Sequence, residues 1–209
     1  MPNEIIPGIY NREDDSGPRP IASLPEGIIG LVGTATRGSD TEIKEVSSIA
    51  ELEKYYGSVA GGSALSEYGT IAINNGAQRI KCVRVLGSGA SEASRAFAGA
   101  SDTTVTLTCK WKGTDGRNIN VTITSGSTGG KSNMVIKHNL TGQTESYPNF
   151  DMLDVDDSYL VNRINAESEL VTAASADTTE LPANVSAQYL AGGSDGTTVA
   201  ASKIGRAHV

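Results

Sequence analysis

The run Val105-Thr-Leu-Thr-Cys-Lys-Trp-Lys-Gly-Thr-Asp-Gly-Arg-Asn-Ile-Asn-Val-Thr-Ile123 decides the fold class of its part of the chain. Apolar residues alternate with Thr and Lys up to Trp111, and with Asn and Thr from Ile119 onward. This is the pattern of strands that bury one face. Asp115-Gly116 lies between the two runs and is typical of a tight turn between antiparallel strands. We therefore predict a β-hairpin here.

More short strands follow this hairpin. A third alternating run lies at 134–140, and further strands are expected at 144–152, 170–174 and 185–190. Asp157 can cap a short helix that carries Leu160 and Ile164. Many short antiparallel strands with one helix are typical of a β-sandwich, which we assign to residues 99–192. A glycine-rich exit leads into 193–203, which we assign as the start of another core segment.

The stretch before the hairpin has a different pattern. Strands are expected at 28–36, where the residues are apolar and small, at 42–47, and at 78–86. We expect the first to be buried and the last to be buried on both faces, because Cys82, Val83 and Val85 leave little polar surface. Two helices separate the second and third strands. Residues 27–98 thus form a small α/β core unit.

The two helices have recognisable ends. Ser48 and Glu51 form a capping box that begins the first helix, and Gly57 ends it. Ser63 begins the second helix, which Asn75-Gly76 ends. In that helix Leu65, Tyr68 and Ala72 have the spacing of one apolar face.

The N-terminal residues 1–26 contain five of the seven prolines and should form an extended arm with little helix. Ile5, Ile6, Ile9 and Tyr10 give this arm an apolar side. Such a segment has no core of its own, and it tends to add a strand to the sheet edge of another subunit. At the other end, residues 204–209 depart from the preceding pattern, and we regard them as a non-native tail.

Composition excludes several classes of protein. The net charge of −7 and pI near 4.9 argue against general nucleic-acid binding, which needs a basic surface. Cys82 and Cys109 lie in apolar-alternating runs, so we expect buried free thiols. We find neither a secretory signal nor an apolar run approaching the roughly 18 residues of a membrane span. The protein is therefore expected to be made in a cytosol and to have no membrane anchor.

Motifs that could carry chemistry are incomplete. Residues 126–132, Gly-Ser-Thr-Gly-Gly-Lys-Ser, resemble a phosphate-binding loop, but Ser125 replaces its first glycine and a strand is expected to follow instead of a helix. His138 is the only histidine outside the suspect tail, and its strand position favours a structural role. Asp154, Asp156 and Asp157 are better explained as solvated or capping charges than as a calcium site. We expect no catalytic, cofactor-binding or metal-binding residues, and no cofactor.

Several segments, in order, resemble the tail sheath family of contractile phages and related injection machines. They are Pro7–Tyr10, Gly30–Gly38, Ser48–Gly57, Asn75–Val85, Trp111–Ile123 and Leu190–Thr197. The resemblance implies an α+β protein with an extended N-terminal arm, a small α/β core unit and an inserted, mainly antiparallel β-sandwich domain. It also implies that the core continues beyond residue 192 into a subtilisin-like layer without protease chemistry, in a chain that is truncated here.

The same resemblance implies a function that is mechanical and not enzymatic. Sheath subunits polymerise around an inner tail tube, contact baseplate and tail terminator proteins, and contract to drive the tube through a host envelope. The expected location is the virion tail sheath, assembled in the host cytoplasm. The alternative is a nucleotide-binding or other cytosolic α/β enzyme domain with an attached β-sandwich, which rests on the glycine-rich turns and the α/β unit.

Overall fold

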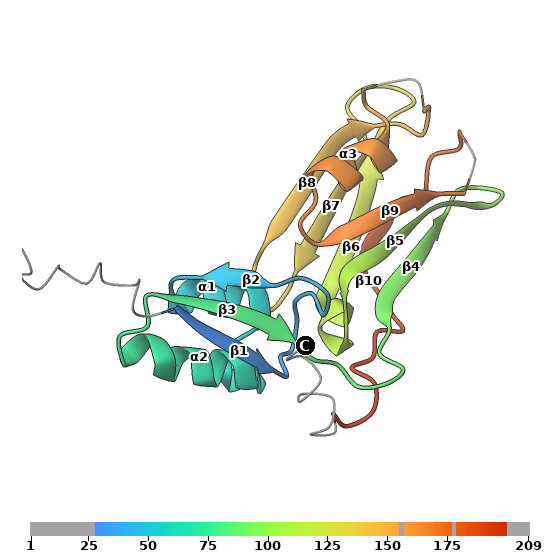
Figure 1. Cartoon of the computed structure of the whole chain (residues 1–209). Coiled ribbons are helices and arrows are strands. Elements are labelled where there is room, and N and C mark those ends of the chain that lie inside the picture. Colours follow the sequence, from blue (N-terminus) through green and yellow to red (C-terminus); the bar gives the residue numbers. More distant parts are fainter. Residues whose placement is uncertain (1–27, 155–156, 177–178, 200–209) are drawn as a thin grey trace, which may run out of the picture.

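The computed structural model describes residues 28–154, 157–176 and 179–199, which form two units side by side (Figure 1). The α/β unit contains β1 (Ile28–Gly33), β2 (Lys44–Val46), α1 (Ile49–Tyr56), a 3₁₀ turn η1 (Val59–Gly61), α2 (Ala64–Asn74) and β3 (Arg79–Arg84). This order of strands and helices agrees with the prediction. The predicted arm at 1–26, with Ile5, Ile6, Ile9 and Tyr10, lies outside the described residues, as do 200–203 and the tail 204–209.

The predicted helix ends are confirmed. The Ser48 hydroxyl accepts a hydrogen bond from the Glu51 N–H at 3.2 Å. The Glu51 carboxylate accepts from the Ser47 N–H at 2.8 Å, one residue earlier than a strict capping box requires. Ser63 caps α2 by accepting from the Ser66 N–H. Gly57 ends α1 at φ +90°, a backbone conformation that favours glycine.

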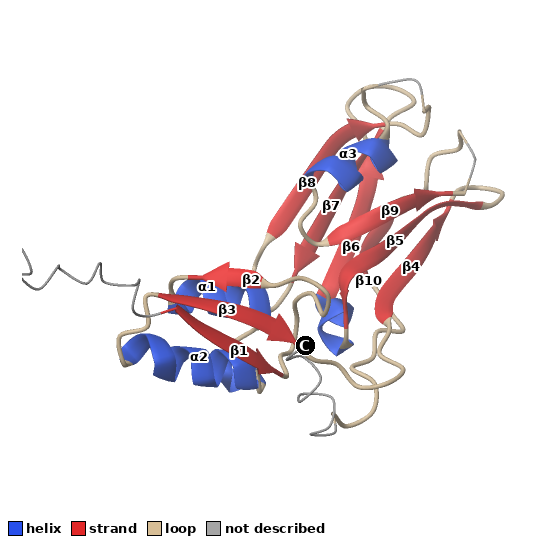
Figure 2. Ribbon diagram, in the orientation of Figure 1, coloured by secondary structure: helices blue, strands red, loops and turns tan. Residues whose placement is uncertain are grey.

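The sheet of the α/β unit has the order β1-β3-β2, with β1 parallel and β2 antiparallel to β3. Both helices pack on the face that carries Ile80 and Cys82, and they share a small core with them. The helices approach closely at Gly69, where an added Cβ would lie 2.4 Å from the Leu52 side chain. Figure 2 shows the helices and strands of this unit.

Three sequence expectations for this unit are wrong. β1 is not buried, because its six residues are exposed or only partly buried. β3 alternates between exposed and buried residues and so buries one face instead of two. Tyr68 does not belong to the buried face of α2 and is 62% exposed. In each case the pattern predicted a covering layer that the described residues do not contain.

The second unit is built from two antiparallel sheets and is called here the two-sheet unit. One sheet has the order β4-β5-β9, with β4 (Glu92–Ala98), β5 (Thr103–Lys112) and β9 (Val171–Ser175). The other has the order β10-β6-β7-β8, with β10 (Val185–Tyr189), β6 (Ile119–Ser125), β7 (Ser132–His138) and β8 (Thr144–Phe150). Buried side chains of both sheets belong to one hydrophobic cluster. Mixed α and β content of this kind confirms the α+β class.

The predicted hairpin around Asp115-Gly116 is wrong, although both of its strands are present. β5 and β6 belong to different sheets, and the 3₁₀ helix η2 (Thr114–Asn118) carries the chain from one to the other. Asp115 and Gly116 are buried in that crossing. Alternation identifies a strand with one buried face, but it does not identify the strand beside it.

The unpredicted strand β4 pairs with β5, so residues 92–98 belong to the two-sheet unit. The predicted boundary between the units, at residue 98, falls after this strand. The helix α3 (Leu160–Glu167) is present with Leu160 and Ile164 buried, but no side chain caps its start at Tyr159. The expected Asp157 cap is wrong. Instead the Leu160 N–H donates to the Asp151 carbonyl at 3.0 Å.

Cys82 and Cys109 are buried free thiols, as predicted. Burial raises the pKa of Cys82 to about 11 and that of Cys109 to about 12. Within the described ranges, each helix is too short or too polar to cross a bilayer.

Candidate functional site

The glycine-rich residues 126–132 form the loop between β6 and β7. The Asn149 side-chain oxygen holds this loop by accepting from the Ser127 N–H at 3.0 Å and from the Thr128 N–H at 3.4 Å. Strand β7 begins at Ser132, so the loop is not followed by a helix N-terminus that could bind phosphate. The predicted strand after the glycine-rich loop is confirmed.

His138 is completely buried and has a structural role. Its Nδ1 accepts from the Thr141 N–H at 3.2 Å, which places the proton of the neutral ring on Nε2. Nε2 lies 3.1 Å from an Asp115 carboxylate oxygen and donates to it. The pair ties η2 to the end of β7. Sequence reasoning missed Asp115 as the partner, because 23 residues separate it from His138.

Only part of the acidic cluster Asp154, Asp156 and Asp157 lies among the described residues. Asp154 and Asp157 are exposed, and Asp156 lies outside the described residues. Among the residues that the structure describes, no group of His, Cys, Asp and Glu side chains could hold a metal ion. The anchored carboxylate nearby is Asp151, which accepts from the Ser158 hydroxyl at 2.6 Å and pairs with Lys131 at 3.1 Å.

Asp151 was missed as an anchor because its partners come together only in the folded chain. Burial by itself would raise the pKa of Asp151. The hydrogen bonds from Ser158 and Lys131 outweigh that effect and lower it. The ionised Asp151 carboxylate therefore links Lys131, next to the start of β7, to Ser158 in the loop before α3.

A surface with no cover among the described residues lies on the three-stranded sheet. The strand register places Ile28 beside Arg79, Gly30 beside Lys81, and Val32 beside Val83. These residues face away from α1 and α2, because Ile80 and Cys82 between them face the helices. Ile28 is 47% exposed, and a Cβ added to Gly30 would meet nothing within 4 Å. Parallel strand pairs are normally covered on both faces, so this face is unusual.

The edge of the same sheet is also unpaired in the described chain. β1 has β3 on one side only, and its sequence Ile-Ile-Gly-Leu-Val-Gly contains no charge or proline. Charges, prolines and bulges are the devices that normally keep an edge strand from pairing. Tyr68 and Ile71 are exposed on the side of α2 turned away from α1. We call this face, the β1 edge, Tyr68 and Ile71 together the open surface.

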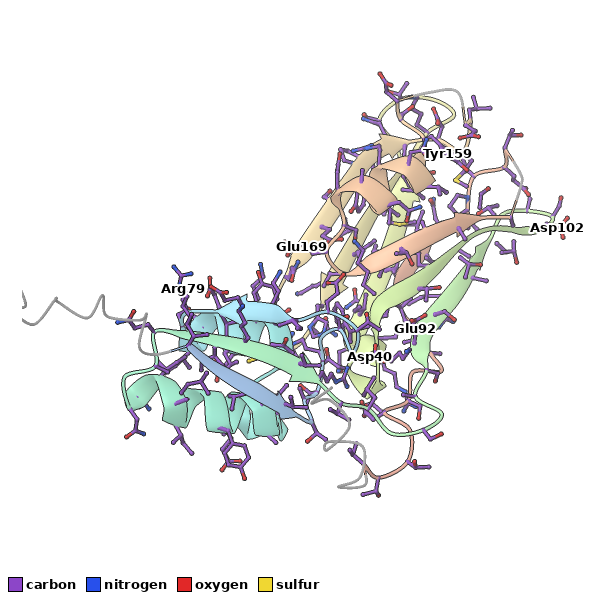
Figure 3. The ribbon with its side chains drawn as sticks, in the orientation of Figure 1. Asp40, Arg79, Glu92, Asp102, Tyr159 and Glu169 are labelled. Atoms are coloured by element: carbon purple, nitrogen blue, oxygen red, sulfur yellow. The ribbon has the colours of Figure 1, made fainter. Side chains whose placement is uncertain are left out.

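A cleft of about 920 Å³ separates the two units near α1. Its charged lining residues are balanced in sign: Arg37, Lys54 and Arg117 against Glu53, Asp115 and Glu169. Lys54 and Glu169 form an exposed ion pair across it at 3.3 Å. In Figure 3, Glu169 and Asp40 lie where the two units meet. Arg79 lies far from this junction on the α/β unit, and Asp102 lies far from it on the two-sheet unit. The formal charges of the lining side chains therefore sum to zero.

Comparison with known proteins gives a fold but no close relative. No family model matches the chain, and no curated protein matches it. Among solved structures, a sheath tail protein from Listeria innocua matches 80% of this chain at a TM-score of 0.59 and 20% identity. One from Desulfitobacterium hafniense matches 93% of it at a TM-score of 0.57 and 16% identity.

These matches confirm, for the fold, the resemblance seen in the sequence. The chain spans only part of the two proteins, 34% of the first and 40% of the second. At such low identity the shared feature is the fold.

Proposed function

We propose that this chain is the N-terminal part of a sheath-like structural subunit that polymerises around an inner tail tube and is not an enzyme. The observation that carries the proposal is the fold match with two sheath tail proteins over most of this chain. The open surface supports it, because an uncovered parallel strand pair is suited to receive further polypeptide.

The polypeptide that follows residue 199 is proposed to cover this surface. The returning segment meets the outgoing one beside the end of β3, where the Gly87 N–H donates to the Asp195 carbonyl at 3.1 Å. The matched sheath tail proteins are more than twice as long as the part that aligns. A continuing subtilisin-like α/β layer would start at the correct end of the sheet to add a strand to β1.

The arm is proposed to link subunits. Ile5, Ile6, Ile9 and Tyr10 would lie along a sheet edge of a neighbouring copy, where backbone hydrogen bonds give affinity and side-chain pockets give specificity. A helical homopolymer formed in this way, with the inner tube, baseplate and tail terminator proteins as further partners, would form the tail sheath of a virion. Assembly is proposed to occur in the host cytoplasm, and contraction to drive the tube through the envelope without nucleic-acid binding or a membrane anchor.

Negative-stain microscopy of the full-length protein tests the proposal. We expect helical tubes or stacked rings from the complete protein and none after deletion of residues 1–22. The deletion variant should keep its circular dichroism spectrum, because the described residues beyond 27 supply two hydrophobic cores. Replacing Ile5, Ile6 and Ile9 with Ser tests the apolar side of the arm alone, and replacing Glu13, Asp14 and Asp15 with Asn serves as its control. Normal tubes from the deletion variant would refute the arm assignment, and persistent monomers of the complete protein would refute the polymer.

A further inference from the structure

Arg84 occupies a position that normally belongs to an apolar residue. It is the last residue of β3 and follows Ile80 and Cys82 on the buried face of that strand. Its side chain has no exposed surface. A buried guanidinium must be paired and fully hydrogen-bonded, because its transfer from water is costly. The partners of Arg84 therefore indicate what holds this region together.

Each of the five N–H groups of the guanidinium has an acceptor. Nε donates to the Ala35 carbonyl at 2.9 Å, and Nη1 donates to the carbonyls of Gly38 at 3.1 Å and Lys112 at 2.7 Å. Nη2 donates to the Thr36 carbonyl at 3.4 Å and to the Asp195 carboxylate at 2.9 Å. These acceptors come from the loop after β1, the end of β5 and the returning segment. One side chain of the α/β unit is thus bonded both to the end of β5 in the two-sheet unit and to the segment that returns from that unit.

Asp195 extends this arrangement to η2. Its second carboxylate oxygen accepts from the Thr114 hydroxyl at 2.7 Å and from the Thr114 N–H at 3.4 Å. The space around Asp195 is so tight that a Cβ on Gly113 would lie 2.4 Å from its Oδ1 and 2.8 Å from Arg84 Nη2. Gly113 also has φ +120°, which favours glycine. Lys112 pairs with Asp40 at 2.9 Å beside it.

The chain passes between the two units twice, and the two connecting segments are hydrogen-bonded to each other. Ser91 and Ser194 exchange backbone hydrogen bonds of 2.9 and 3.0 Å, and the Thr197 N–H donates to the Ser88 carbonyl at 3.0 Å. At Gly87 a Cβ would lie 1.7 Å from the Thr197 carbonyl oxygen, so only glycine permits this approach. Two hydrogen-bonded connecting segments resist rotation of one unit relative to the other more than two unbonded segments would.

We propose that Arg84, Asp195, Thr114, Lys112 and Asp40, together called the Arg84 latch, fix the two units in a single orientation. Asp195 completes the latch, because it comes last of these residues in the sequence. Among the described residues it is also the only one whose carboxylate bonds the Arg84 guanidinium. Rotation of the two-sheet unit would remove the Lys112 and Asp195 acceptors and leave a desolvated cation. The two units therefore move as one rigid body, whether or not the chain forms a sheath.

The ion pair across the cleft provides a matched control. Lys54 and Glu169 also link the two units, but their side chains are 50% and 62% exposed. An exposed pair of this kind contributes little, because water and salt screen it. The proposal places the orienting contacts at the Arg84 latch and not at this pair.

The test measures the distance across the cleft in the 209-residue chain. Nitroxide labels are attached at Val59→Cys and Leu140→Cys, which are exposed positions on opposite units, while the native Cys82 and Cys109 are buried. Double electron–electron resonance should give one narrow distance distribution. Asp195→Ala should broaden it at least twofold, and Thr114→Val, which removes one hydrogen bond from Asp195, should broaden it less. Lys54→Ala should leave it unchanged.

A broad distribution in the labelled parent, or an unchanged one in Asp195→Ala, would overturn the proposal. If Asp195→Ala does not fold, Asp195→Asn replaces it, because the amide keeps the size of the side chain and loses its charge. Amide hydrogen exchange supplies a readout that needs no labels. The Ser91, Ser194 and Thr197 amides should exchange at least tenfold faster in Asp195→Asn than in Lys54→Ala, and equal rates would contradict the latch.

Discussion

The two units of this protein differ in how completely they cover their apolar residues. Among the described residues, twenty form the buried core of the two-sheet unit and six form that of the α/β unit. The two-sheet unit closes its core between two sheets, with α3 lying between its outer strands β8 and β9 (Figure 1). Within the part of the chain that the structure describes, the α/β unit covers one face of its sheet, and the other face and the β1 edge are open.

This difference indicates which unit is a complete structure. Stability grows with the fraction of surface that folding buries, so a small layer with one open face is the weaker unit. We expect the two-sheet unit to be the more stable of the two, and the α/β unit to gain stability from polypeptide that covers its open face. The Arg84 latch then joins the weaker unit to the stronger one.

The largest expected effect comes from the same truncation in each core. Leu107→Ala in the two-sheet unit and Leu52→Ala in the α/β unit each remove a fully buried side chain. Each should lower the free energy of unfolding by about 2–5 kcal/mol. Urea titration with hydrogen exchange should show that Leu52→Ala exposes α1 and β3 first, while the two-sheet unit stays protected.

Leu140→Ala is the control for both truncations, since Leu140 is 71% exposed and should change stability by less than about 0.5 kcal/mol. If Leu52→Ala and Leu107→Ala unfold the whole chain in one identical transition, the units are not of unequal strength and the comparison fails.

A smaller effect is expected from alkaline pH. It should be equal in the two units up to about pH 11 and larger in the two-sheet unit only above that value. The thiol pKa is raised to about 12 at Cys109 and to about 11 at Cys82, in both cases by burial. Unfolded thiols ionise near pH 8.5, so the unfolded state is favoured as pH rises above that value. Stability is fully present below it and is lost at about 1.4 kcal/mol per pH unit and thiol until the folded pKa is reached.

Urea unfolding at pH 8 and pH 10 measures this loss, with the thiol-free variants Cys109→Ala and Cys82→Ala compared at the same two values. Each variant should lose part of the pH dependence of its own unit. A pH dependence that neither substitution reduces would show that other groups cause it.

The smallest change in stability, with a clear change in association, is expected at the β1 edge. Ile28→Lys places a charge at an exposed position of an unpaired strand, which opposes pairing with other chains. The free energy of unfolding should change by less than about 0.5 kcal/mol, because the side chain packs little. Sedimentation velocity should show less self-association than in the parent chain.

Leu153→Lys is the matched control, since Leu153 is similarly exposed but lies on the two-sheet unit. Equal reduction of self-association by both substitutions would mean that net charge, and not the β1 edge, governs association.

The sequence by itself determined the local structure of this protein. Alternation at 105–123 placed both strands, and Ser48 and Ser63 fixed the starts of the two helices of the α/β unit. Such features depend on residues that are near one another in the chain, so their spacing carries the information. The strand after the glycine-rich loop was also predictable, because its residues have a clear period of two.

Only the tertiary structure decided which strands are neighbours and which polar residues meet. β5 and β6 have the pattern of a hairpin, yet they lie in different sheets, because the alternation of a strand does not name its partner. Arg84 and Asp195 are 111 residues apart, and their pairing depends on the return of the chain to the end of β3. The exposure of β1 has the same origin. Its apolar sequence predicts burial, and burial needs a covering layer that the described chain does not contain.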